Sequence, residues 1–192
     1  SHVYGDYPWT NNPAGEKARL FFDEVQVRME GVHRGDVIRL EKRENDTAEF
    51  YRIDFVEAEL APPALARPRN SLSLEEFGAI PNDGLDDSSA FVACLAAASA
   101  SQRILWIPAG EFRLDGERIP IGDVVIRGAW MWHSKLTGLR PMFEGNGRPL
   151  HMSDLAIFGG VDHRDNEAPD NAFNGNFGDG TILKNLWIEH VK

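Results

Sequence analysis

Three short segments of this chain share one pattern at a fixed interval. Each has an Asp or Asn, an apolar residue, any residue and then an isoleucine; these isoleucines, Ile126, Ile157 and Ile188, lie 31 residues apart. A repeat of this length predicts a solenoid whose units stack on one another. Each unit holds one short strand and no helical periodicity, so we predict a parallel β-helix with the three isoleucines stacked and the Asp or Asn residues marking turns.

One amphipathic helix is predicted before the repeats. Its apolar stripe has the spacing i, i+3, i+4, i+7 and consists of Phe91, Cys94, Leu95 and Ala98. Asp86 or Asp87 is placed to cap its first turn. We expect the helix to cover the N-terminal end of the solenoid, where backbone and core would otherwise be exposed. Cys94 is the only cysteine, so it forms no intrachain disulfide and is predicted to be a buried thiol.

The first 60 residues follow a different pattern. Apolar and polar residues alternate around 25–27, 38–40 and 51–55, which is typical of half-buried antiparallel strands. We therefore predict a β-sandwich, or part of one, in residues 1–60. Three prolines between 62 and 68 oppose both helix and sheet, so residues 61–70 are predicted to form an extended linker.

The charge balance limits the partners of this chain. Asp and Glu number 30 against 20 Lys and Arg, which gives a formal net charge of −10. Such a surplus repels phosphate backbones and anionic lipid surfaces, and no local basic patch offsets it. No apolar run reaches the length of a membrane span. We expect no nucleic-acid or membrane partner, whereas neutral polymers such as polysaccharides remain open.

Two stretches after the linker carry a resemblance. Residues 77–90 (FGAIPNDGLDDSSA) and 106–114 (WIPAGEFRL) resemble the start of pectate-lyase-like right-handed β-helix proteins. That superfamily contains lyases, hydrolases and phage tailspikes, so the resemblance implies a fold and not a reaction.

A narrower resemblance covers nearly the whole chain. Its segments resemble glycoside hydrolase family 87 and are residues 4–13, 21–25, 35–40, 51–55, 155–159, 164–165 and 186–192. The resemblance implies a secreted, inverting endo-hydrolase, an α-1,3-glucanase or mycodextranase, that binds neutral α-glucan in a groove along a β-helix. The expected fold class is all-β: a partial sandwich in 1–60, the linker 61–70, and the first coils of a right-handed parallel β-helix with an N-terminal capping helix in 71–192.

The same resemblance implies where catalysis occurs. In that family the catalytic aspartates lie on later coils, in motifs that this chain lacks. Glycoside hydrolysis needs two carboxyl groups at a fixed separation, and we assign no such pair here. We therefore expect no catalytic residue in this chain, catalytic aspartates beyond Lys192, and the rest of the β-helix as its continuation or as a separate partner chain.

Candidate binding residues gather in one loop. Residues 161–171 contain Asp162, His163, Arg164 and Asp165, and loops of a solenoid often gather on its binding face. These side chains could hydrogen-bond sugar hydroxyls, with Trp132 as a stacking surface. The alternatives are a solvated loop and a tryptophan at the rim of the solenoid.

No cofactor is required by the expected chemistry, but a structural calcium ion is possible, and His163 with Asp162 and Asp165 could also ligate a metal. Asp23, Glu24 and Asp54 could supply oxygen ligands, although exposed strand charges would explain them as well. Two other functions remain open. One is a non-catalytic carbohydrate-binding or tailspike-like module. The other is a polysaccharide lyase, which the acidic surplus disfavours because uronate polymers need cations around their carboxylates.

Overall fold

The computed structural model describes residues 26–45, 53–116, 118–138, 143–161 and 171–191. These residues form mostly parallel β-strands and one α-helix. The elements are β1 (Ser71–Ser73), the 3-10 helix η1 (Leu74–Phe77), α1 (Ser88–Ser101), β2 (Ile104–Ile107), β3 (Gly110–Arg113), β4 (Ile119–Ile121), β5 (Val124–Gly128), β6 (Ser134–Thr137), β7 (Phe143–Asn146), β8 (Leu150–Phe158), β9 (Phe173–Asn176) and β10 (Ile182–Glu189).

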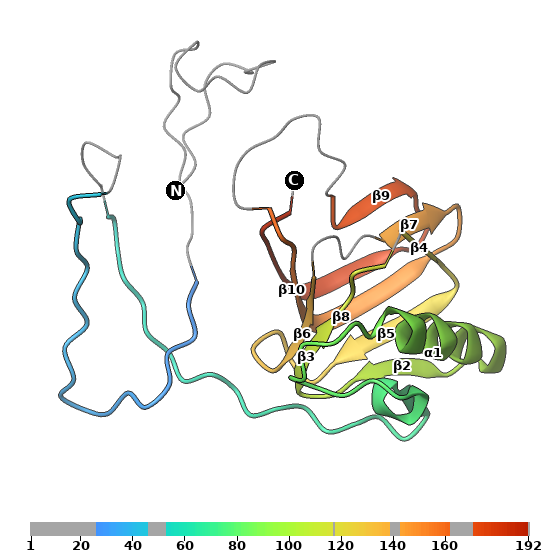
Figure 1. Cartoon of the computed structure of the whole chain (residues 1–192), viewed down its shortest axis with the longest axis horizontal. Coiled ribbons are helices and arrows are strands. Elements are labelled where there is room, and N and C mark those ends of the chain that lie inside the picture. The colour runs from blue at the N-terminus through green and yellow to red at the C-terminus, as the bar shows by residue number, and fades with distance from the viewer. Residues whose placement is uncertain (1–25, 46–52, 117, 139–142, 162–170, 192) are drawn as a thin grey trace, which may run out of the picture.

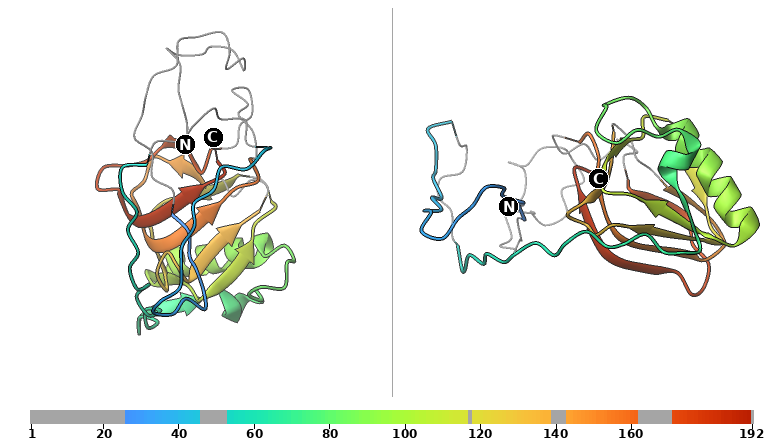
Figure 2. Two further views of the ribbon diagram at one scale, coloured as in Figure 1. Left: turned by 90° about the vertical axis from the view of Figure 1, so that its left-hand side faces the viewer. Right: turned by 90° about the horizontal axis from the view of Figure 1, so that it is seen from below.

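The strands stack as coils with three faces (Figure 1). The first face consists of β1, β2, β5 and the first halves of β8 and β10. The second face consists of β3, β6 and the second halves of β8 and β10. The third consists of β4, β7 and β9. All pairs are parallel, and the left view of Figure 2 shows the strands following one another in chain order away from α1. This is the architecture of a parallel β-helix.

Alternate residues of each strand point into a common interior. On the first face the inward row is Leu105, Ile126 and Met152, and on the second it is Phe112, Leu136 and Ile157; all six are fully buried. On the third face the rings of Phe143 and Phe173 stack with centroids 5.7 Å apart. Burial of these stacked rows supplies the main driving force for the fold.

The predicted isoleucine stack is correct for two of its three members. Ile188 pairs with Ile157 on the second face, but Ile126 lies on the first face and pairs with Met152. The coils are unequal: the stacked residues Leu105, Ile126, Met152 and Leu183 are spaced by 21, 26 and 31 residues. Loop length therefore changes from coil to coil, and only the last interval of 31 reflects stacking.

The predicted turn residues do occupy turns. Asp154 and Asn185 have positive φ values of 63° and 51°, and each bends its strand from the first face to the second. Asn185 Nδ2 donates to Asp154 Oδ1 at 2.8 Å, while Arg127 Nε and Ser153 Oγ donate to Asp154 Oδ2. Asp and Asn tolerate this left-handed conformation better than most residues. The buried carboxylate of Asp154 is thus fully used in holding the turn.

Helix α1 buries the predicted stripe. Phe91, Cys94, Leu95 and Ala98 are all buried in the core cluster, and the Phe91 ring lies 5.8 Å from that of Phe143. The helix contacts β1, β2 and β5, and Figure 1 shows it beside β2 and β5. A role in protecting this end from association remains a prediction. Within the described part of the chain, no helix is long and apolar enough to span a bilayer.

Two adjacent aspartates fix the start of α1. Asp86 Oδ1 accepts hydrogen bonds from the backbone N–H of Ser88 at 3.0 Å and of Asp115 at 3.0 Å. Asp87 occupies the N-cap, but its side chain does not cap the helix. Its Oδ1 instead accepts from the backbone N–H of Ile80 at 3.2 Å, and its Oδ2 from that of Arg113 at 3.1 Å. Asp87 therefore joins the preceding turn to β3.

Because the thiol of Cys94 is buried, we predict that the free energy of unfolding depends on pH. Burial raises its pKa from 9.0 to about 11. The unfolded chain thus loses this proton at lower pH than the folded chain, so stability is complete below pH 9 and falls as pH rises toward 11. We expect the wild type to lose about 3 kcal/mol relative to Cys94→Ala over that interval, measured by urea unfolding. Parallel pH profiles for the two proteins would contradict this.

The predicted N-terminal sandwich is not confirmed. In residues 26–45 and 53–60 no strand is formed, and nearly all side chains are exposed, including Val37 at 86% and Phe55 at 78%. Figure 1 shows these residues as an extended segment beside the β-helix. Alternating sequences need a pairing partner to form a sheet, and the described residues of this segment provide none.

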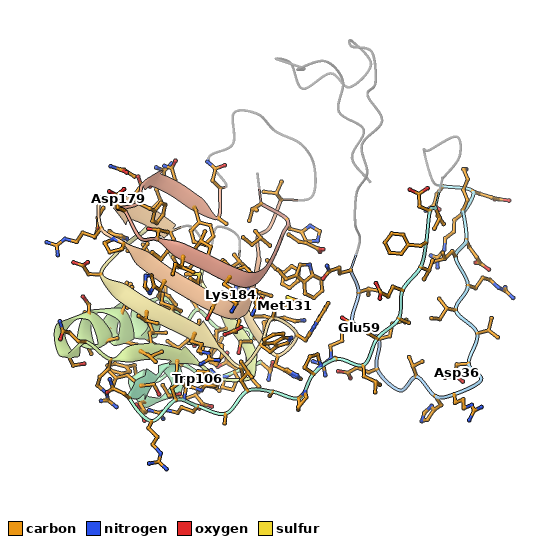
Figure 3. All side chains as sticks on the ribbon, turned by 180° about the vertical axis from the view of Figure 1, so that it is seen from behind. Asp36, Glu59, Trp106, Met131, Asp179 and Lys184 are labelled. Carbon is orange, nitrogen blue, oxygen red and sulfur yellow. The ribbon has the colours of Figure 1, made fainter. Side chains whose placement is uncertain are left out.

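The proline-rich residues form no helix or strand up to Pro68, and they hydrogen-bond to the β-helix. Leu65 N–H donates to the carbonyl of Ala129 at 3.0 Å, and His133 Nε2 lies 2.7 Å from the carbonyl oxygen of Pro62. Both partners belong to the corner turn 129–133 between β5 and β6. Figure 3 labels Met131 of this turn, on the side that faces the extended segment. The domain limits at residues 60 and 70 stay predictions.

Candidate functional site

The outer surface of the second face carries two rows of stacked side chains. Because Phe112, Leu136 and Ile157 point inward, their neighbours along each strand point outward. One outer row is Glu111, Lys135, Ala156 and Trp187, and the other is Arg113, Thr137, Phe158 and Glu189. This face therefore combines charged, hydroxyl and aromatic groups within a few strands.

A cleft of about 490 Å³ opens on this face. Its lining consists of Asn82, Gly84, Glu111, Arg113, Thr137, Gly138 and Gly160. Strand β3 contributes Glu111 and Arg113, and the end of β6 contributes Thr137. Gly138 follows β6, Gly160 follows β8, and the turn before α1 contributes Asn82 and Gly84. A volume of this size is in the range of ligand sites, which hold a few oriented polar groups.

The turn before α1 is joined to β3 at the cleft. Asn82, with φ of 64°, donates its backbone N–H to the Glu111 carbonyl at 2.8 Å, and Asn82 Oδ1 accepts from Glu111 N–H at 3.0 Å. This pair extends the sheet by one residue and leaves the Glu111 side chain exposed. Thr137 Oγ1 donates to Glu111 Oε1 at 3.3 Å. One wall of the cleft is therefore a carboxylate next to a hydroxyl.

Arg113 is held in place by its own neighbours. Its Nε donates to Asp115 Oδ2 at 2.5 Å, and its Nη1 lies 3.5 Å from the carbonyl oxygen of Gly84. The Arg113 side chain is 48% exposed. The guanidinium thus reaches the cleft with its charge already matched by a carboxylate.

An aromatic cluster adjoins the cleft. It consists of Trp132, Phe158 and Trp187; the Trp187 ring centroid lies 4.9 Å from that of Trp132 and 4.8 Å from that of Phe158. Trp187 Nε1 donates to Glu189 Oε1 at 2.8 Å, which orients the indole. Since Phe158 and Thr137 are register partners on neighbouring strands, cluster and cleft are continuous.

The carboxylates near the cleft do not form an acid–base pair. Glu111 is the one carboxylate that lines it within the described residues. Asp86 and Asp87 hold the turn before α1: the Ser88 hydroxyl lowers the pKa of Asp86, whereas burial raises the pKa of Asp87. Glycoside hydrolysis requires two carboxyl groups flanking the bond. The arrangement can bind a polar ligand, but it does not supply that pair.

The predicted binding residues fall partly outside the described chain. Trp132 is half-buried and belongs to the aromatic cluster. Asp162, His163, Arg164 and Asp165 lie outside the described residues, and the loop that holds them follows Gly160, which lines the cleft.

The predicted calcium ligands are not brought together in the described residues. Asp23 and Glu24 lie outside them, and Asp54 is exposed in the extended segment. In the ranges that the structure does describe, no group of three or more His, Cys, Asp or Glu side chains is placed to hold a metal ion. The calcium site stays a prediction.

Four polar residues of the cleft were not predicted as a site. Asn82, Glu111, Arg113 and Thr137 were either assigned to the fold motifs 77–90 and 106–114 or left unassigned. A signal did exist, because in 110–113 polar residues flank Phe112 at alternate positions, as on a strand with one wet face. Which such strands lie side by side depends on the coil lengths, which that pattern does not show.

Comparisons with known proteins support one enzyme family. The catalytic unit of a thermostable GH87 α-1,3-glucanase from Streptomyces thermodiastaticus strain HF3-3 is 33% identical, with a TM-score of 0.60 over 67% of this chain. The Agl-KA catalytic domain is also 33% identical, with a TM-score of 0.57 over 69% of this chain. The resemblance to glycoside hydrolase family 87 is thereby confirmed.

The extent of the match is limited. This chain covers 24% of the first of those chains and 25% of the second. The A-module of the mannuronan C-5 epimerase AlgE4 from Azotobacter vinelandii is 19% identical, with a TM-score of 0.49, too distant a likeness to bear on function. No protein-family model and no curated protein matches the chain.

Proposed function

We propose that this chain is the N-terminal portion of a secreted glycoside hydrolase of family 87 that degrades α-1,3-linked glucan. The observation that carries the proposal is the 33% identity and TM-score of 0.60 to a GH87 α-1,3-glucanase catalytic unit. A shared fold alone would not support it, because β-helices serve many functions. Sequence identity at this level together with the fold favours a shared substrate class, a neutral polysaccharide.

We place the catalytic carboxylates in coils beyond Lys192. Two facts support this: the chain covers 24% of its neighbour, and the described cleft has Glu111 as its single carboxylate. An inverting hydrolase needs one carboxylic acid to protonate the leaving oxygen and one carboxylate to activate water. In this proposal the coils described above extend the substrate surface, and the chemistry occurs further along the β-helix.

The proposal also includes secretion of the enzyme and a structural calcium ion. We propose secretion because a glucan polymer that lies outside the producing cell is too large to be taken up, so an enzyme that degrades it would act outside. A structural calcium ion bound by Asp23, Glu24 and Asp54 would stabilise the N-terminal segment. No other cofactor is required, because hydrolysis of this kind uses only carboxyl groups and water.

The test compares two proteins on the same substrates. One is the product of the complete reading frame that encodes this sequence, and the other is the 192-residue chain. We expect the complete product to release reducing ends from α-1,3-glucan and not from α-1,4-glucan or polygalacturonate, and the 192-residue chain to release none.

The other outcomes decide between the alternatives. Release of reducing ends by the 192-residue chain would overturn the location of catalysis beyond Lys192. Glucan binding without hydrolysis by the complete product would favour a non-catalytic binding module. Unsaturated uronate products, detected by their ultraviolet absorbance, would identify a polysaccharide lyase and overturn the proposal.

A further inference from the structure

We infer that the cleft and the aromatic cluster of the second face together form a non-catalytic subsite for a neutral sugar segment. The inference rests on the proposed function and adds to it a binding site formed by named residues of this chain. Its basis is the continuity of the two features: Thr137 lines the cleft, its register partner Phe158 belongs to the cluster, and Phe158 contacts Trp187.

Charge determines the class of ligand. Arg113 is the one cationic residue that lines the cleft within the described residues, and Asp115 pairs with it at 2.5 Å. Glu111 adds an exposed negative charge in the same cleft. Lys135 is the register partner of Glu111, but it does not line the cleft and its Nζ lies over the Phe158 ring, 5.6 Å from the centroid. A uronate in the cleft would place its carboxylate near Glu111, and the cation that lines the cleft, Arg113, is already paired with Asp115. The hydroxyl groups of a neutral sugar meet no such repulsion.

The hydrogen-bonding groups suit sugar hydroxyls. A carboxylate accepts hydrogen bonds from hydroxyl groups, and such charge-assisted bonds are about twice as strong as neutral ones. Glu111 is exposed and has acceptor capacity beyond its bond with Thr137, whose hydroxyl can also accept. The Asn82 Oδ1 is used by the Glu111 backbone N–H, which fixes the orientation of that amide.

Glycines leave the space for a ring. Gly84, Gly138 and Gly160 line the cleft without side chains. At Gly138, φ is +136° and a Cβ would lie 2.2 Å from the Leu114 carbonyl oxygen. Packing between coils therefore requires glycine there.

The aromatic cluster supplies the apolar part of the subsite. The C–H faces of a glucosyl ring are apolar and pack favourably on aromatic side chains, which bury large areas in binding sites. Trp187 is oriented by Glu189, and its edge-on contact with Phe158 leaves both rings half-buried and not enclosed. A chain of sugars that occupies the cleft would extend across this cluster.

The experiment measures binding of a linear tetrasaccharide of α-1,3-linked glucose to the 192-residue chain by calorimetry. We expect Glu111→Gln to weaken binding about tenfold, since it replaces a charge-assisted acceptor. Trp187→Leu should weaken it similarly, and Trp187→Phe should retain most of the affinity because a flat ring remains. The matched controls are Glu75→Gln, an exposed carboxylate on η1, and Phe55→Leu, an exposed aromatic in the extended segment.

Several results would overturn the inference. One is unchanged affinity in both Glu111→Gln and Trp187→Leu, with circular dichroism showing that both variants are folded. Another is tighter binding of tetragalacturonate than of the neutral tetrasaccharide. Thr137→Val offers a second variant in case Trp187→Leu fails to fold, and it too should weaken binding.

Hydrolysis by the complete reading-frame product distinguishes the two proposals. If that product hydrolyses α-1,3-glucan while the cleft variants bind normally, the subsite is wrong and the proposed function stands. If the cleft binds the tetrasaccharide as expected and no hydrolysis occurs, the subsite stands and the hydrolase assignment fails.

Discussion

Replacement of Asp87 by alanine is expected to lower the free energy of unfolding by about 3 kcal/mol. Its two carboxylate oxygens accept the backbone N–H groups of Ile80 and Arg113, and the residue is 6% exposed. Alanine would leave both donors without their partner at the junction of the turn, α1 and β3. Urea unfolding followed by circular dichroism measures the loss.

Two further variants test whether the loss of stability comes from the hydrogen bonds that Asp87 accepts. Asp87→Asn retains one acceptor oxygen and should cost roughly half as much. Asp83→Ala removes an exposed carboxylate four residues away, which accepts from the backbone N–H of Leu85, and should cost less than about 1 kcal/mol. Equal losses in Asp83→Ala and Asp87→Ala would show that the bridging role assigned to Asp87 is wrong.

Replacement of Gly138 by alanine should have an effect of similar or larger size, about 4 kcal/mol. Two costs add at this position. The φ of +136° is unfavourable for any residue with a Cβ, and that Cβ would lie 2.2 Å from the carbonyl oxygen of Leu114 on the preceding coil. The coils are joined here by the hydrogen bond from Leu114 N–H to the Thr137 carbonyl at 2.7 Å, so they cannot separate without losing it.

Gly147→Ala provides the matched control. Gly147 also has a positive φ, +82°, but an added Cβ there would meet nothing within 4 Å. Its replacement should therefore cost about 1 kcal/mol, from backbone conformation alone. The difference between the two variants measures the steric contact between coils. If thermal and urea unfolding place both variants at the same stability, the close approach at Gly138 does not constrain the fold.

The periodicity of apolar residues predicted the helix correctly, but the 31-residue repeat predicted the stacking of the isoleucines only in part. The stripe of Phe91, Cys94, Leu95 and Ala98 depends only on the 3.6-residue period, and the structure buries all four. The stacking of Ile126 on Ile157 depended on equal coil lengths. It failed because this coil is 26 residues long and not 31, so Ile126 stacks on Met152 of the first face, while Leu136, beyond the corner turn 129–133, stacks on Ile157.

In the candidate site, too, one residue was predicted from the sequence, whereas its contacts arise only in the fold. Trp132 was predicted as a binding residue from its chemistry, and it does lie in the aromatic cluster. Its ring partner Trp187 is 55 residues away in the chain, and Phe158, which contacts Trp187, is 26 residues away; the three rings come together only because coils stack. Glu111 and Thr137 likewise come together through the pairing of β3 with β6.

The amino-acid sequence by itself determined the parts that depend on neighbouring residues: the helix stripe, the buried thiol, the turns at Asp154 and Asn185, and a solenoid of parallel strands. The tertiary structure alone decided which strands lie side by side, and therefore that Asn82, Glu111, Arg113 and Thr137 share one cleft. The physical reason is that stacking register is the sum of all turn lengths between two strands. A difference of a few residues in one turn moves every later side chain to another face, without changing the local pattern that produces each strand.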